Sequence, residues 1–168
     1  NIPLMQNQPL FSWLTNHYEV WRELTAEAVS VSTKTGLIEL MKSGTTTSSD
    51  HLYLFPHHTS DELIDAEIES AKALGIRFQP TRGSMSLGKS QGGLPPDDTV
   101  QTEAKIQEDT ERLLSIYHDD TDGAMTRISL APCSPFSVTP ELMKSTAEFA
   151  LANGLQIHTH LAETLDEE

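Results

Sequence analysis

Apolar residues recur along the chain at intervals that distinguish helices from strands. Between residues 9 and 23 they return every three or four positions, from Leu10 to Trp21, which is the spacing of one helix face. A second helix is predicted from Thr25, whose side chain can cap it, to Gly44, which can end it. The first 44 residues are therefore predicted to form two helices.

Beyond residue 44, predicted strands and helices alternate. Strands are predicted over residues 45–51, 76–81, 126–131 and 155–161, the first of them with the weakest apolar content. Helices are predicted from Ser60 and Asp61 to Gly75, from Asp97 or Asp98 to about Tyr117, and from Thr139 to Asn153 and Gly154. Strands that alternate with helices, without hairpins, predict a parallel sheet covered by helices. The loop from Gly83 to Pro96 is too long for a simple connection and indicates a functional or mobile segment.

Residues able to do chemistry follow three of these strands. Arg82 follows the second strand, Cys133 follows the third, and His160 and Glu163 close the fourth. Polar side chains at the carboxyl ends of successive strands form the active-site face of a (β/α)8 barrel. An open doubly wound sheet fits the same alternation, but no G-x-G-x-x-G follows any strand. The pattern therefore favours an α/β fold that is part of a (β/α)8 TIM-type barrel.

The last predicted strand carries the pattern that says most about chemistry. His158 and His160 are two positions apart, so both imidazoles point to the same face of a strand. Two imidazoles on one face suit a divalent metal such as zinc, and the carboxylate of Glu163 can then move protons. When only the two histidines are considered, hydrogen bonding by two polar strand residues explains them as well as metal binding does.

Charge and cysteine content narrow the choice of partner and compartment. The 168 residues include 25 acidic and 11 basic side chains, and the net charge of -14 argues against binding to nucleic acid or to an anionic membrane. No apolar run approaches the length of a membrane span. The one cysteine, Cys133, excludes an internal disulfide framework and fits a reducing cytoplasm.

The two ends of the chain lead us to expect an internal fragment of a longer protein. The sequence begins at Asn1 without an initiator methionine and stops in the acidic turn Asp166–Glu168. Residues 1–168 are accordingly expected to be part of one barrel domain, with no second domain.

Four segments together resemble the amidohydrolase superfamily. They are Thr81–Ser86, Gly92–Asp97, Ala131–Val138 and His158–Thr164. Within the superfamily they are most similar to 8-oxoguanine deaminases and to hydroxydechloroatrazine ethylaminohydrolases. The HxHxxE pattern is common to a broad branch of deaminases. The combination of Thr81–Ser86, which contains Arg82, with the Cys-Ser-Pro segment in Ala131–Val138 is typical of a much smaller group of proteins.

The resemblance implies that the chain supplies barrel strands two to five. His160 would be a metal ligand, for one Zn²⁺ with Fe²⁺ also possible, and His158 would have a supporting role. A His-x-His on strand one, a histidine on strand six and an aspartate on strand eight would complete the site from outside these residues. The whole protein is expected to form a homo-oligomer.

The resemblance also implies roles for four further residues. Glu163 would shuttle protons, and its alternative is an ordinary acid at a helix start. Arg82 would reach the substrate, and its alternatives are a solvated charge at a strand end and a salt bridge that braces the loop. Cys133 falls where relatives that act on nucleosides carry a histidine, and it is expected to line the pocket rather than act as a nucleophile. Trp13 matches a tryptophan near the substrate in relatives, although a core position suits it equally.

The implied reaction is hydrolytic deamination of a small heteroaromatic substrate. Metal-activated water attacks the ring carbon that bears the exocyclic amine, and ammonia leaves. The leading expectation for the substrate is an oxidised purine, 8-oxoguanine, which would give urate and ammonia. A hydroxylated s-triazine or a pterin is the nearest alternative, and a non-catalytic barrel relative is the alternative of another class. The 168 residues alone are expected to be inactive.

Overall fold

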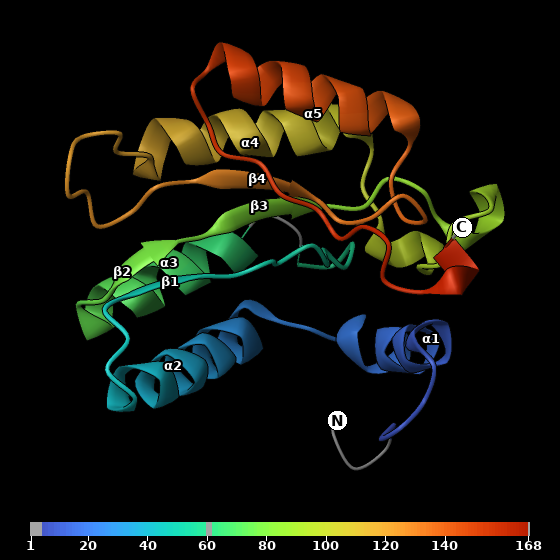
Figure 1. Cartoon of the computed structure of the whole chain (residues 1–168), viewed down its shortest axis with the longest axis horizontal. Coiled ribbons are helices and arrows are strands. Elements are labelled where there is room, and N and C mark those ends of the chain that lie inside the picture. Colours follow the sequence, from blue (N-terminus) through green and yellow to red (C-terminus); the bar gives the residue numbers. More distant parts are fainter. Residues whose placement is uncertain (1–4, 60–61, 168) are drawn as a thin grey trace.

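A computed structural model describes residues 5–59 and 62–167, in which helices flank short parallel strands (Figure 1). The helices are α1 (Leu10–Trp21), α2 (Ala26–Lys42), α3 (Leu63–Leu74), α4 (Glu103–Tyr117) and α5 (Pro140–Ala152). The strands are β1 (Thr47–Ser49), β2 (Arg77–Gln79), β3 (Thr81–Ser84) and β4 (Ser129–Pro132). Short 3-10 turns cover Lys89–Gln91, Asp97–Thr99 and Leu165–Glu167. No helix in the described ranges is both long enough and apolar enough to cross a membrane.

Most helix ends follow signals that are readable in the sequence. The Thr25 hydroxyl accepts a hydrogen bond from the Ala28 N–H at 3.1 Å, and the Thr139 hydroxyl accepts one from the Leu142 N–H at 3.1 Å. Gly75 ends α3 with φ 71°, a conformation that glycine adopts without strain. The three predicted helices that depend on these signals are confirmed. The predicted start of α3 at Ser60 and Asp61 lies outside the described residues.

The predicted start of α4 at Asp97 or Asp98 is wrong. Those residues form the 3-10 turn Asp97–Thr99, and α4 begins at Glu103 behind the side-chain cap of Thr102. The reason lies in the residues between this turn and the helix. Val100 is extended, and the Gln101 N–H donates a hydrogen bond to the Met85 carbonyl at 2.9 Å. This hydrogen bond ties the chain to the loop after β3 and delays the helix.

The strands pair in parallel, as the alternation predicts, but their extents differ from expectation. β1 pairs with β2 and β3 pairs with β4, so the strand predicted over residues 76–81 is two strands with different partners. Pro80 separates them because it has no N–H to donate to a ladder. The last predicted strand is reduced to one bridge between Leu130 and Ile157, although the His158 N–H still donates to the Leu130 carbonyl at 3.1 Å.

Helices α4 and α5 lie over β3 and β4, whereas α3 lies beside β1 and β2 and packs against α2 (Figure 1). Helix α1 lies apart from these and packs Leu14 and Tyr18 against Leu54, Met85 and Cys133. These last three residues follow β1, β3 and β4 respectively. Helix α1 therefore covers the carboxyl ends of the strands, where the candidate chemistry was predicted.

Candidate active site

Three histidines meet beyond the carboxyl end of β1. The His51 ring stacks on the His160 ring with centroids 4.2 Å apart and planes 14° apart, and it lies 4.7 Å from the His158 ring. The expectation that His158 and His160 share one face is confirmed by this common neighbour. Burial, followed by the proximity of His160 and His158, lowers the pKa of His51 to about 4. His51 is therefore a neutral imidazole at physiological pH.

The carbonyl group of Cys133 orients the His160 ring. It accepts hydrogen bonds from the His160 backbone N–H at 3.0 Å and, with the tautomer assigned from this contact, from Nδ1 at 2.9 Å. When Nδ1 carries the proton, Nε2 keeps its lone pair, which is the arrangement of a typical metal-binding histidine. The geometry of His160 thus fits a ligand to a divalent metal.

A complete metal site requires more ligands than this part of the protein supplies. Within residues 5–59 and 62–167, no group of three or more histidine, cysteine, aspartate or glutamate side chains is arranged to hold a metal ion. Structural and catalytic zinc sites have at least three protein ligands. The described residues therefore offer His160 as a ligand but not a complete site.

Glu163 follows a strained turn after His160. Ala162 has φ 57°, a left-handed conformation that costs an alanine on the order of 1 kcal/mol. The Glu163 N–H donates to Glu167 Oε2 at 2.7 Å, which holds the turn closed. Burial is the main cause of the raised pKa values of Tyr18, Tyr53 and Cys133, and the charge of the exposed Glu163 side chain adds to it. The carboxylate therefore acts electrostatically on the same group of side chains that α1 covers.

Cys133 and Trp13 both belong to this covered region. Cys133 is buried, and burial raises the pKa of its thiol to about 11. A protonated, buried thiol is a poor nucleophile, which agrees with the expected role in the pocket wall. Trp13 is half-buried, packs against the cluster that contains Cys133, and has its ring centroid 4.1 Å from that of His17.

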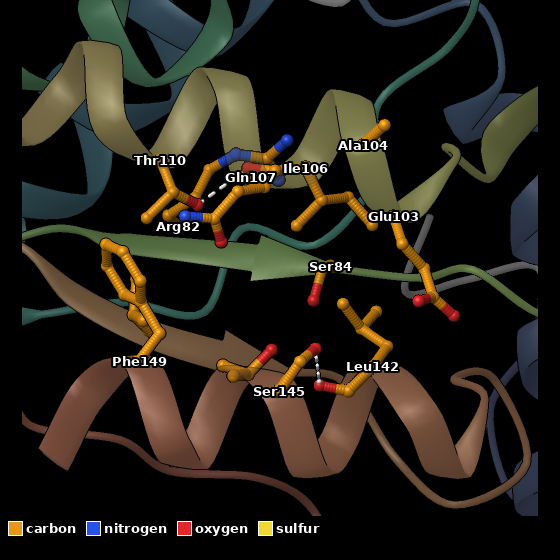
Figure 2. Close-up of a pocket in the computed structure, with 12 residues that line it drawn as sticks. Arg82, Ser84, Glu103, Ala104, Ile106, Gln107, Thr110, Leu142, Ser145 and Phe149 are labelled. Atoms are coloured by element: carbon orange, nitrogen blue, oxygen red, sulfur yellow. Dashed lines mark hydrogen bonds between the residues drawn. The ribbon is translucent and has the colours of Figure 1, made fainter. Parts of the chain in front are cut away.

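Arg82 lies away from the histidines, on the helix side of β3 (Figure 2). Its Nε is 2.7 Å from Asp109 Oδ2 on α4, its Nη2 donates to Gln101 Oε1 at 2.7 Å, and its guanidinium lies 4.1 Å from the centre of the Phe55 ring. The arginine is 1% exposed. The alternative interpretation of Arg82, a salt bridge that braces the loop, describes these contacts better than a substrate contact does.

The cavity in Figure 2 is separate from the histidine cluster. It has a volume of about 270 Å³ and lies between α4, α5 and the strands β3 and β4. Its lining includes Arg82, Ser84 and Phe149, but neither His160 nor Glu163. The candidate active site is therefore defined by the histidines and their neighbours rather than by this cavity.

Sequence reasoning missed Tyr53, which stands beside the histidines. Its ring is edge-on to His51, with centroids 5.5 Å apart, and edge-on to His160, with centroids 6.1 Å apart. Residues two positions apart in an extended segment share one face, so the spacing of His51 and Tyr53 was the available signal.

Comparisons with known proteins show the family of the chain. The amidohydrolase family model matches residues 2–168, and the chain belongs to the amidohydrolase family. It is 54% identical to 8-oxoguanine deaminase of Pseudomonas aeruginosa over 162 residues, which are 96% of this chain and 36% of that protein. It is 34% identical to hydroxydechloroatrazine ethylaminohydrolase of Pseudomonas sp. strain ADP, over 92% of this chain and 32% of that protein. The chain thus spans about a third of the length of these relatives.

Solved structures show the same relationship. A mutant of atrazine chlorohydrolase from Arthrobacter aurescens, complexed with zinc and atraton, is 34% identical and superimposes with a TM-score of 0.90. The superposition covers 98% of this chain and 38% of that chain. Guanine deaminase from C. acetobutylicum, at 23% identity and a TM-score of 0.72 over 98% of this chain and 36% of that one, shares the fold.

Proposed function

We propose that the whole protein containing this chain is a metal-dependent hydrolytic deaminase that converts 8-oxoguanine and water to urate and ammonia. The observation that carries the proposal is the 54% identity to an 8-oxoguanine deaminase across almost the whole chain. A hydroxylated s-triazine or a pterin is the second candidate substrate, because relatives at 34% identity are named for a triazine compound and for isoxanthopterin.

Residues 1–168 would form one continuous part of a (β/α)8 barrel domain. In this assignment β1 belongs to barrel strand two, β2 and β3 to strand three, β4 to strand four, and residues 155–161 to strand five. The parallel pairing of β3 with β4 and the parallel bridge from Leu130 to Ile157 support that order. The remaining strands and metal ligands would come from the rest of the protein.

Within this site, His160 would hold Zn²⁺ or Fe²⁺ through Nε2. The metal, when bound, lowers the pKa of water so that a nucleophile exists near neutral pH. Glu163 would accept the proton of that water and deliver it to the ring nitrogen and the departing amine. Cys133 and Trp13 would form an apolar wall for the ring, and Arg82 would hold β3 against α4 without touching substrate.

Assays of the full-length protein test this proposal. Ammonia release should be fastest from 8-oxoguanine when it is compared with guanine, isoxanthopterin and hydroxylated triazines. His160→Ala should lower metal content and abolish turnover, whereas His58→Ala, at an exposed histidine, should change neither. Glu163→Gln should retain metal and lose about 100- to 10,000-fold in turnover. Absence of ammonia from every purine would contradict the proposed substrate, and absence of metal would favour a non-catalytic relative.

A further inference from the structure

Tyr53 is held rigidly at the edge of the histidine cluster. Its ring packs against the buried cluster that contains Leu14 and Cys133, and it is edge-on to both His51 and His160. Two perpendicular ring contacts and an apolar support fix the direction in which the phenol points. Tyr53 therefore meets the requirement for a recognition residue, a side chain preorganised by its packing.

The hydroxyl of Tyr53 makes no hydrogen bond to any described residue. The hydroxyl of Tyr18, in the cluster against which Tyr53 packs, is also without a partner in the described part of the chain, although Tyr18 is 1% exposed. Buried polar groups are nearly always satisfied in native proteins, so the Tyr18 hydroxyl requires an explanation. Tyr53 is half-buried, and its hydroxyl keeps its hydrogen-bonding capacity beside His160.

A tyrosine phenol is protonated at neutral pH, because its ordinary pKa is about 10. A protonated phenol can donate a hydrogen bond through its O–H, and its flat ring offers apolar contact. Oxidised purines, pterins and hydroxylated triazines in their keto forms carry carbonyl oxygens and unprotonated ring nitrogens that accept such a bond.

We propose that Tyr53 is a substrate-binding residue whose hydroxyl donates a hydrogen bond to a carbonyl oxygen or an unprotonated ring nitrogen of the heteroaromatic substrate. The substrate ring would then lie between Tyr53, His160 and Glu163. This inference rests on the proposed deaminase function and adds a recognition contact to it.

Tyr53→Phe in the full-length protein removes the hydroxyl and keeps the ring. We expect kcat/KM to fall about 10- to 100-fold, with most of the change in KM, because one hydrogen bond to bound substrate is lost. Metal content should stay at the wild-type level. The matched control is Tyr117→Phe, whose hydroxyl donates to Asp65 at 2.8 Å and which lies on α4; its kcat/KM should be unchanged.

The outcomes separate this inference from the function on which it rests. Wild-type kcat/KM in Tyr53→Phe, with active wild-type enzyme, would overturn the substrate contact and leave the deaminase assignment intact. Loss of metal from Tyr53→Phe would also overturn it, because the phenol would then act through His160. If wild-type protein released no ammonia from any of the ring compounds, the proposed function and this inference would fall together.

Discussion

At the scale of single residues, the best-defined unusual chemistry is a pair of buried carboxyl groups behind the site. Asp50, which immediately precedes His51, accepts a 2.8 Å hydrogen bond from the Thr81 N–H. Glu67 of α3 is 7% exposed, and its carboxyl group lines the same small cavity as Asp50 and interacts with it electrostatically. Burial and the neighbouring carboxylate raise the pKa of Glu67 far above its usual value. Glu67 therefore stays protonated at neutral pH beside Asp50, whose hydrogen bond from Thr81 joins the ends of β1 and β3.

Glu67→Gln should stabilise the full-length protein at neutral pH. Unfolded Glu67 ionises above about pH 4.5 while folded Glu67 keeps its proton, so wild-type stability falls as pH rises from the unfolded pKa towards the raised folded pKa. Glutamine keeps an N–H donor towards Asp50 and removes this titration. We expect unfolding free energy to rise by about 1–3 kcal/mol near pH 8 and the pH dependence above about pH 5 to flatten.

Urea denaturation across this pH range measures the effect. Glu69→Gln is the matched control, because Glu69 is exposed on the same helix, where it pairs with Lys72 at 2.9 Å. Parallel stability curves for wild type and Glu67→Gln across the whole pH range would contradict a raised pKa for Glu67 in the folded protein.

At the scale of elements, the ion pair between Arg82 and Asp109 joins β3 to α4. Their side chains are 0% and 3% exposed, and Asp109 also lies 2.9 Å from Arg112 Nη2. Asp109→Ala would leave the buried guanidinium without its carboxylate, at an expected cost of about 3–5 kcal/mol in unfolding free energy. Glu108→Ala, at an exposed position on the same helix, should cost less than about 1 kcal/mol. Thermal unfolding of both variants checks the difference, and equal losses would mean that the pair contributes no more than a surface charge.

The same elements show what the sequence could and could not predict. Helix ends with local signals, such as the Thr139 cap and Gly75, were predictable because the signal and the structure lie within one turn. The face on which Arg82 lies was not, because it depends on the break at Pro80 and on a new partner for β3. Gly83 adds a constraint of the same kind: a Cβ there would lie 2.1 Å from the Leu52 carbonyl oxygen, a contact invisible in the sequence.

At the scale of the whole molecule, the sequence predicted more about architecture than about the site. Alternating strands and helices were sufficient for parallel pairing, because strands joined by helical crossovers run in the same direction. The pair of His158 and His160 was also recognisable from spacing alone. The positions of His51 and Tyr53 beside them depend on how β1 lies relative to the segment after α5, and contacts between such distant segments leave no local pattern.

The isolated 168-residue chain should neither deaminate nor bind zinc tightly. Its described residues provide one well-oriented histidine ligand rather than a complete set, and large apolar side chains stand exposed on α5 and after it, including Leu151 at 86% and Leu161 at 71%. Unpaired strand edges and exposed apolar residues favour self-association. Zinc titration should show no saturation at micromolar concentrations, and light scattering should give a mass that grows with protein concentration. Turnover of 8-oxoguanine by this chain alone would contradict the assignment of its remaining metal ligands to the rest of the protein.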